Sequence, residues 1–443
     1  MALSTQPYKG ARDFYPEDKR LQNYMFGVLR DTVRRFGYEE YDAPILEPLE
    51  IYLAKSGEEI VNEQTYVFTD RGDRQVVIRP EMTPTVSRMV AAKRQELAYP
   101  LRWFSIPNLW RYERPQRGRL REHWQLNVDL FGIAGQEAEH ELILLVDAIF
   151  KTFHAKRDMY TIRINHRQLV NALLSDYLHL DEVQAQSMGK LIDRMHKLEP
   201  AAFEAQADAI LPPSAREAGA SQKLLDVLKV KRLADLPAEL HTHAAARELA
   251  VLLDLLQAQG IDNVEFDLTV MRGFDYYTGI VFEVFDTDPS NNRAMLGGGR
   301  YDGLVGLFGV EPVPTVGFGW GDVTLQNFLE AHKLLPDIAN PVDAYVVLVG
   351  DVYEPAQAAI AALRQMGLNV AVDISGRSAD KQIKTAVKKD IPFAIFIGAA
   401  EVADNQFTLR NLATGVEEKH SLERIVSIAK DHRHRGDDSA ADN

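Results

Sequence analysis

The segment Arg111–Gly132 reads RYERPQRGRLREHWQLNVDLFG, two extended runs on either side of an arginine-rich loop. From His123 onward, polar and apolar residues alternate with the period of two that is typical of a β-strand. By the same period, Arg111 and Glu113 share one face of the first run. The segment therefore predicts a hairpin whose returning strand has an apolar face and a second face that carries His123, Gln125, Asn127 and Asp129.

The loop of this hairpin holds four arginines, at positions 114, 117, 119 and 121. Guanidinium groups bind phosphate through paired hydrogen bonds, whereas the amide and carboxylate of Gln125 and Asp129 suit an amine or an imidazole. An alternating strand is also typical of a hairpin that simply faces solvent. Because so many arginines adjoin these acceptors, we favour a site for a nucleotide beside a small zwitterion.

Composition limits the possible classes of protein. The chain has 443 residues, 46% hydrophobic and 26% charged, as expected of a globular protein with two or three domains. It has no cysteine, which excludes disulfides, thiolate metal sites and a thiol nucleophile. The net charge of −14 argues against indiscriminate binding of polyanions but permits a local basic surface. Residues 1–9 lack a signal-peptide core and no run is long enough to span a membrane, so we expect a cytoplasmic protein.

Periodicity predicts the elements of the first 335 residues. Helical spacing indicates helices over 20–36 and 137–153, and Asp70–Asp73 is typical of a hairpin turn between strands at 65–69 and 75–79. Further extended runs cover 102–113, 123–131, 264–270 and 279–286. Between them, residues of about 169–259 are rich in Ala, Leu, Lys and Glu at helical spacing, which predicts a helical insertion.

The remaining chain alternates short apolar runs with helical segments. Strands are expected at 345–349, 370–374 and 393–397, and helices at 355–366 and 380–389. Such alternation predicts a separate α/β domain, at about 341–430, with a partly parallel sheet. The polar residues 431–443 lack periodicity, and we expect them to be disordered.

Several motifs together resemble the class II aminoacyl-tRNA synthetases. Arg111–Gly132 is similar to their second signature motif in its histidyl form, and Phe36–Glu47 resembles the first, which builds a dimer interface in that class. Arg79–Pro84 is similar to a segment that lines the amino-acid pocket. The resemblance implies an α+β catalytic domain on an antiparallel sheet, with a helical insertion and a C-terminal α/β anticodon-binding domain.

Two peptides resemble sequences peculiar to histidyl-tRNA synthetases. They are Met271–Gly279, MRGFDYYTG, and Gly298–Leu304, GGRYDGL. A single arginine or glycine run is weak evidence, but both peptides follow the other motifs in the family's order. The resemblance implies ligation of histidine to its tRNA through a histidyl-adenylate made from ATP and Mg²⁺, by a homodimer.

The resemblance also implies roles for individual residues. Glu81 and Gln125 are expected to bind the α-ammonium of histidine. Asp129, where relatives usually carry Glu, is expected to contact the imidazole together with Tyr277. The remaining predicted histidine-site residues are Thr83, Arg111, Arg272 and Tyr276.

For ATP, the resemblance implies that Arg111 and Arg272 neutralise the α-phosphate from opposite sides, and we predict both as catalytic. Glu113 is expected at the adenine end, and Arg119 is expected to reach the nucleotide. Carboxylate attack on phosphorus requires positioning and charge neutralisation more than a base, because the carboxylate is already ionised.

The third class II motif departs from the family pattern. Thr324 and Val323 stand where Arg and Glu are expected, and a hydroxyl cannot replace a guanidinium as a charge clamp. Three hypotheses follow. Arg117 or Arg119 holds the ATP tail with Asp322 as a metal ligand, the enzyme binds ATP weakly, or the chain is a histidine-sensing regulatory subunit of ATP phosphoribosyltransferase. We favour the first, since the chain keeps the arginine loop and the C-terminal domain that such subunits tend to lose.

In the C-terminal domain, the spacing of four lysines places much of their charge on one helix face. This pattern suits RNA phosphates, although a solvated helix face is equally compatible with it. We predict a tRNA-binding surface from Lys381, Lys384 and Lys388, with Lys389 beside them.

Overall fold

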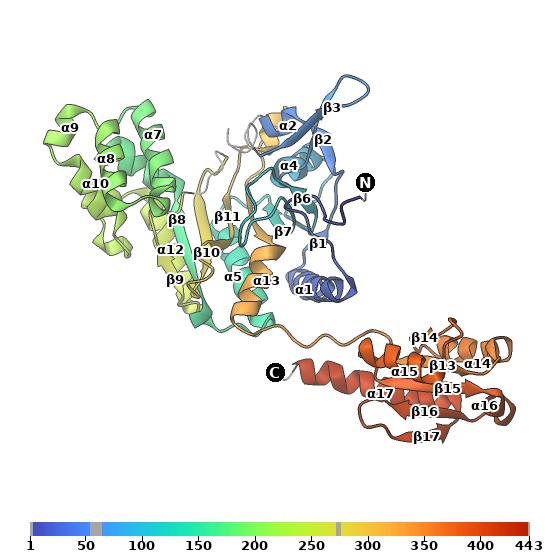
Figure 1. Cartoon of the computed structure of the whole chain (residues 1–443). Helices are drawn as coiled ribbons and strands as arrows, with labels where there is room; N and C mark the ends of the chain where they lie inside the picture. Colours follow the sequence, from blue (N-terminus) through green and yellow to red (C-terminus); the bar gives the residue numbers. More distant parts are fainter. Residues whose placement is uncertain (1–2, 54–63, 272–275, 442–443) are drawn as a thin grey trace. The chain divides into compact units, whose positions relative to one another are not determined.

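The computed structural model describes residues 3–53, 64–271 and 276–441, with side chains as far as Arg433. The chain forms two compact units, residues 1–334 and 335–443 (Figure 1). Each has a buried apolar core of its own. None of the helices in these described ranges combines the length and the apolar character needed to cross a membrane.

The first unit is built on a nine-stranded sheet. Its order is β1-β5-β7-β12-β11-β10-β8-β9, and β6 pairs with β7. Only the two outer pairs, β1 with β5 and β8 with β9, are parallel. The sheet is otherwise antiparallel, in agreement with the expected α+β class. The strands are β1 (Glu39–Glu40), β5 (Leu101–Ser105), β6 (Asn108–Trp110), β7 (Glu122–Phe131), β8 (Tyr160–His166), β9 (Val264–Phe266), β10 (Ile280–Asp286), β11 (Ala294–Arg300) and β12 (Thr315–Gly321).

The hairpin expected at Arg111–Gly132 forms, with a shorter first strand than predicted. Pro107 lacks an N–H and interrupts the run, so β5 and β6 pair separately with the two ends of β7. Arg111 and Glu113 follow β6 in a turn, where the Glu113 N–H donates to the Arg111 carbonyl at 2.8 Å. The prediction that they share a strand face was therefore wrong.

Helices α1 (Pro16–Arg35), α5 (Glu137–Thr152) and α13 (Asp322–Ala331) supply apolar side chains to the sheet's core. Phe150 of α5 stacks on Tyr160 of β8, with ring centroids 3.8 Å apart, and also packs on Trp320 of β12. Trp320 alternates along β12 with Gly319 and Gly321, so packing of the tryptophan on α5 turns these glycines to the opposite face. That opposite face carries the polar side chains of β7.

A small sheet, β2-β4-β3, stands beside the large one. Its strands are β2 (Leu46–Pro48), β3 (Tyr66–Thr69) and β4 (Gln75–Ile78), and the β3–β4 hairpin turns at Asp70–Asp73 as predicted. Two helices accompany it, α2 (Glu50–Leu53) and α4 (Thr83–Ala92). The connection from β4 to α4 carries Arg79 to Met82, so it brings Glu81 to the start of α4.

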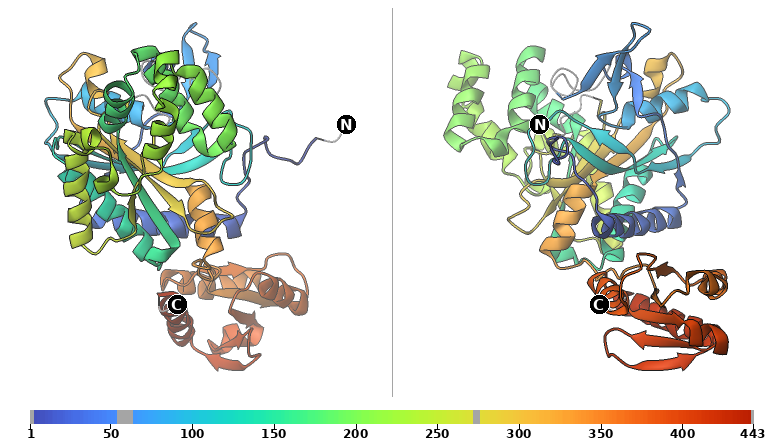
Figure 2. Two further views of the ribbon diagram at one scale, coloured as in Figure 1. Left: turned by 90° about the vertical axis from the view of Figure 1, so that its left-hand side faces the viewer. Right: turned by 45° about the vertical axis from the view of Figure 1, so that its right-hand side comes forward.

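Between β8 and β9 the chain is helical, in the stretch where the sequence predicts an insertion. Figures 1 and 2 show α7 to α10 as a group of their own at the β8 end of the sheet, while α12 runs along it. Lys231 binds the buried Asp267 at 2.8 Å and ties the insertion to the chain after β9. The helices are α6 (Arg167–Asn171), α7 (Glu182–Asp193), α8 (Pro200–Ile210), α9 (Pro213–Glu217), α10 (Ala220–Leu228), α11 (Ala238–His241) and α12 (Ala244–Ala258).

The second unit has a five-stranded sheet in the order β14-β13-β15-β16-β17. Its first three strands are parallel and the last two are antiparallel, which confirms the expected partly parallel α/β fold. The strands are β13 (Ala344–Val349), β14 (Val370–Val372), β15 (Phe393–Gly398), β16 (Phe407–Asn411) and β17 (Glu417–His420). The helices are α14 (Tyr353–Gln365), α15 (Ala379–Lys388), α16 (Ala399–Asp404) and α17 (Leu422–Ala441).

Helix α17 continues into residues 431–441, where the sequence predicts disorder. Arg433 donates two hydrogen bonds to the carboxylate of Asp343, and His432 packs edge-on against Phe393, with ring centroids 5.2 Å apart. These contacts attach the helix to the sheet in a stretch where its own sequence is polar. Local polarity did not reveal them, because Asp343 and Phe393 lie far away in the sequence.

Candidate active site

A pocket opens on the polar face of β7, between the large sheet and the start of α4. It brings together seven of the eight residues predicted to bind histidine. The eighth, Arg272, lies outside the described residues. The pocket is lined by Glu81, Thr83, Arg111, Gln125, Asn127, Asp129, Tyr276, Tyr277, Gly297, Tyr301, Gly317, Phe318 and Gly319.

Two glycines of β12 keep this face open. Gly317 pairs with Asp129 and Gly319 pairs with Asn127 on β7. An added Cβ would lie 2.3 Å from Asp129 Oδ1 at position 317 and 2.7 Å from Gln125 Nε2 at position 319. Any larger residue would therefore displace the two side chains that we expect to contact the amino acid.

Asp129 is a buried carboxylate at the base of the pocket, with 4% of its surface exposed. The Tyr301 hydroxyl donates a short hydrogen bond to its Oδ1, while Oδ2 is buried without a hydrogen-bond partner in the described chain. Burial raises the pKa of Asp129 to about 7, although the neighbouring hydroxyls of Tyr301 and Tyr41 oppose that shift. The carboxylate thus has one acceptor oxygen available to a donor that enters the pocket.

Glu81 and Arg111 also line the pocket. The Tyr276 hydroxyl donates to Glu81 Oε2 at 3.2 Å, and Tyr52, from α2, donates to the Glu81 carbonyl at 3.2 Å. Arg111 Nε donates to the Pro80 carbonyl at 2.9 Å, so the Arg79–Met82 connection also positions the guanidinium. An acidic and a basic group are thereby fixed at adjacent points, as a zwitterionic ligand requires.

Beyond Arg111, the loop after β6 carries Glu113, Arg119 and the neighbouring His123 of β7. Glu113 is buried and forms an ion pair with Arg119. Burial, together with the charges of Arg111, Arg12 and Arg119, lowers the pKa of His123 to about 3. His123 is therefore neutral at physiological pH, and the neighbouring arginines supply the positive charge around it.

Asp322 at the start of α13 is engaged within the protein. It binds Arg12 Nη2 at 2.7 Å and accepts the Trp124 N–H at 3.0 Å, and its side chain is 2% exposed. A carboxylate held in this way does not fit the hypothesis that Asp322 is a metal ligand. No cluster of three or more metal-ligating residues occurs in the described ranges.

Sequence analysis did not assign three of the residues that shape this region, Asn127, Tyr301 and Arg12. Asn127 is on the predicted polar face of the strand, and Tyr301 lies within the GGRYDGL peptide, so the sequence alone could have indicated both as site residues. The Arg12–Asp322 pair joins residues 310 positions apart, and no local pattern points to it.

In the second unit, the predicted lysines lie on α15. Lys381, Lys384 and Lys388 are exposed, while Gln382 and Ala386 turn inward. Gln382 donates to the Leu348 carbonyl and accepts the Leu348 N–H at 3.1 and 3.0 Å, which fixes the helix on β13. The three lysines thus face solvent on a rigid support.

An antiparallel sheet with a polar pocket on one face, flanked by an arginine loop, defines the catalytic domain of a class II aminoacyl-tRNA synthetase. A family model described as Histidyl-tRNA synthetase matches residues 10–321, and one described as Anticodon binding domain matches residues 343–432. The chain belongs to the histidyl-tRNA synthetase family.

Similar proteins agree with this assignment. The chain is 45% identical over 414 residues to a Histidine--tRNA ligase of Leptospira biflexa, covering 93% of this chain and 94% of that protein. It is 40% identical over 434 residues to one from Opitutus terrae, covering 96% and 98%. The crystal structure of histidyl-tRNA synthetase from Nostoc sp. PCC 7120 has a TM-score of 0.79 and 23% identity, covers 97% of this chain and 100% of that one, and shows the shared fold.

Proposed function

We propose that this chain ligates histidine to tRNA(His) in two steps, through a histidyl-adenylate formed from ATP. The observation that carries the proposal is the single pocket that joins Asp129, Gln125 and Glu81 to Arg111. It combines acceptors for an ammonium and an imidazole with a cation for a phosphate.

Histidine is selected, in this proposal, by buried polar groups. Glu81 and Gln125 bind the α-ammonium, and the free Oδ2 of Asp129 accepts an imidazole N–H, with Tyr277 on the other nitrogen. An apolar amino acid would leave these groups buried without partners, which is strongly disfavoured. Thr83 and Tyr276 complete the walls, since Tyr276 holds Glu81 by its hydroxyl.

In the first step, a carboxylate oxygen of histidine attacks the α-phosphorus of ATP. A new O–P bond forms, the bond from the α-phosphorus to the bridging oxygen breaks, and pyrophosphate leaves with the electron pair. Arg111 neutralises the α-phosphate, and Arg272 is proposed to do so from the other side. Glu113 and Arg119 form the nucleotide end. Glu113 retains acceptor capacity for the adenine amino group, because a carboxylate has about four acceptor positions.

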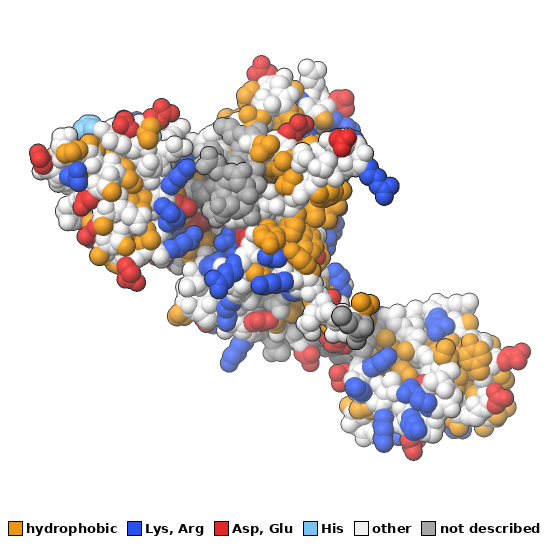
Figure 3. Space-filling model, turned by 45° about the horizontal axis from the view of Figure 1, so that its top comes forward, with side chains coloured by type: hydrophobic (Ala, Val, Ile, Leu, Met, Phe, Trp, Pro, Cys, Tyr) orange, Lys and Arg blue, Asp and Glu red, His pale blue; other side chains and the backbone are white. Residues whose placement is uncertain are grey.

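In the second step, a hydroxyl of the terminal adenosine of the tRNA attacks the carbonyl carbon of the adenylate, and AMP leaves. The second unit is proposed to hold the tRNA through the exposed Lys381, Lys384 and Lys388. Figure 3 shows Lys and Arg side chains together on the visible face of this unit, which supports a surface for phosphates despite the overall negative charge.

Magnesium is proposed only as the ion that accompanies ATP. Mg²⁺ is commonly held by substrate phosphates and water with few protein carboxylates, and the one candidate ligand, Asp322, is committed to Arg12. No step here is routed through the ion. A cytoplasmic location is proposed because translation supplies the substrate tRNA there.

A homodimer is proposed through the surface around β2. Ile45 and Leu46 are each 45% exposed, and Leu307 of the short helix η5 (Val305–Phe308) is 47% exposed. A hollow of about 580 Å³ lies between α2, α4 and η5. A second copy would cover this apolar surface, since large exposed apolar patches mark interfaces. Sedimentation of the Leu307→Glu variant should then show a shift towards monomer.

Histidine-dependent ATP–pyrophosphate exchange tests the proposal. Purified protein should incorporate labelled pyrophosphate into ATP in the presence of histidine, and not in the presence of proline, threonine or glycine. The Gln125→Ala variant should show reduced exchange at limiting histidine. Binding of histidine without any exchange, in folded protein, would instead favour the regulatory-subunit hypothesis.

A further inference from the structure

The position of the missing third-motif arginine is occupied by a residue whose hydroxyl is bound to the backbone. The Thr324 hydroxyl lies 2.8 Å from the Met295 carbonyl and 3.0 Å from the Gly321 carbonyl, and it donates to the backbone. Neither Thr324 nor the engaged Asp322 supplies positive charge. If ATP binds, its phosphate tail needs cations from other elements.

A second pocket lies directly beside Thr324. It has an empty volume of about 330 Å³, and its lining includes Arg117, Asn291, Arg293, Met295, Thr324 and Asn327. Met295 of this pocket and Gly297 of the histidine pocket are two positions apart on β11, so the two pockets lie close together along this strand.

Arg117 is positioned in this second pocket by neutral groups. Its Nε donates to Asn291 Oδ1 at 3.3 Å and its Nη2 donates to Ser290 Oγ at 3.2 Å. Asn291 is itself fixed by hydrogen bonds to Asp286 at 2.7 Å and to the Asn327 carbonyl at 3.2 Å. The guanidinium is thus aimed before any ligand arrives.

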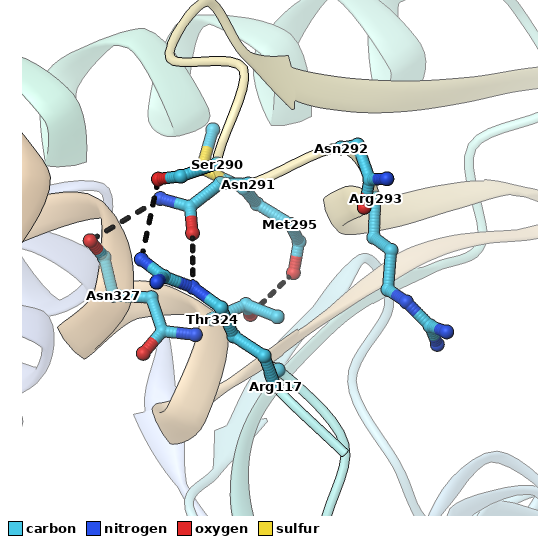
Figure 4. Close-up of a pocket in the computed structure, with 9 residues that line it drawn as sticks. Arg117, Ser290, Asn291, Asn292, Arg293, Met295, Thr324 and Asn327 are labelled. Carbon is cyan, nitrogen blue, oxygen red and sulfur yellow. Dashed lines mark hydrogen bonds between the residues drawn. The ribbon is translucent and has the colours of Figure 1, made fainter.

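Arg293 lines the same pocket, and in Figure 4 its guanidinium lies on the other side of Thr324 from that of Arg117. Figure 4 shows its side chain apart from Arg117, with no dashed line to its guanidinium. It is exposed, and it makes no hydrogen bond or ion pair with the described part of the chain. By contrast, Arg119 is paired with Glu113. Asp288 accepts the Ser290 N–H at 2.8 Å, and the charge of Arg117 is among the causes that lower the pKa of this carboxyl, so Arg117 also has one acidic neighbour.

We propose that Arg117 and Arg293 together hold the β- and γ-phosphates of ATP in this second pocket, in place of the absent third-motif arginine. The inference rests on the proposed adenylation reaction. The two guanidiniums would bind the tail from two sides of Thr324 and neutralise the pyrophosphate as its bond to the α-phosphorus breaks. This assigns to Arg293 a role that sequence analysis did not consider.

The test compares Arg117→Ala, Arg293→Ala and the double variant with wild type in the exchange assay. Each single variant should raise the KM for ATP and for pyrophosphate about tenfold, and the double variant about a hundredfold, as expected for charge-assisted contacts. The KM for histidine and inhibition by AMP should be unchanged, because neither ligand has the tail. Arg293→Lys keeps the positive charge, so its KM for ATP should rise less than that of Arg293→Ala. Arg71→Ala, on the exposed β3–β4 turn, is the matched control.

Unchanged KM values for ATP and pyrophosphate in the double variant would overturn the inference. A parallel loss of AMP inhibition would also overturn it, since the arginines would then contact the nucleoside. The thermal midpoint of each variant excludes misfolding. Wild-type protein without exchange activity would instead refute the proposed function itself.

Discussion

The histidine pocket and the pocket beside Thr324 are neighbours along β11 but are built in opposite ways. In the first, the polar groups are buried and held by neighbours, as Tyr301 holds Asp129 and Tyr276 holds Glu81. In the second, the arginines are exposed, and the hydrogen-bond partners of Arg117 are neutral groups. Buried polar groups give selectivity because a wrong ligand leaves them unpaired, whereas exposed cations give charge neutralisation with little discrimination.

The largest effect is expected at Arg111, in the histidine pocket. Arg111→Ala should reduce the rate of histidyl-adenylate formation by about 10³-fold, because it removes a positioned cation from the reacting phosphate. Single-turnover measurement of adenylate formation checks this. Because Arg111 also lines the histidine pocket, histidine-induced stabilisation against heat should weaken as well. A loss of adenylate formation of less than tenfold would show that Arg111 is not at the phosphate.

Asp129→Ala should be specific to the histidine pocket. We expect the KM for histidine to rise about 10²-fold, since an imidazole N–H would lose its charged acceptor, while the KM for ATP stays within twofold. The exchange assay at varied histidine and varied ATP gives both values. An unchanged histidine requirement would remove Asp129 from the pocket, whereas an equal rise in both constants would indicate a general defect.

The raised pKa of Asp129 predicts a pH dependence of stability. Between about pH 4 and 7, the ligand-free native protein keeps a proton that the unfolded chain releases. The free energy of unfolding contributed by this group should therefore fall as pH rises through that window, by on the order of 4 kcal/mol. Denaturant unfolding of wild type and Asp129→Asn across this range checks the prediction, and parallel curves would contradict it.

The smallest effect is expected in the second unit, far along the chain from either pocket. Lys384→Glu with Lys388→Glu should weaken tRNA binding about tenfold at moderate salt, because phosphate contacts dominate such affinity. Exchange, which needs no tRNA, should be unchanged. Lys223→Glu with Lys229→Glu is a charge-matched control in the insertion. Equal loss of tRNA binding in both pairs would indicate a general charge effect rather than a site on α15.

Local patterns were sufficient for most elements of the fold. The alternation in β7, the turn at Asp70–Asp73 and the strand–helix order after residue 341 were all visible, because each depends on a period of two or of about 3.6 residues. They failed at Arg111–Glu113, where Pro107 and the separate pairing of β6 ended the strand, and at α17, which distant contacts extend.

The sequence by itself determined the family, the antiparallel class of the sheet and most of the residues that line the histidine pocket. These follow from motifs and from strand periodicity, which are properties of neighbouring positions. Only the tertiary structure decided that Asp322 belongs to Arg12, that Tyr301 holds Asp129, and that Arg293 joins Arg117 beside Thr324. Such pairs depend on which strands lie side by side, and that order is set by packing across the whole sheet rather than by any local run of residues.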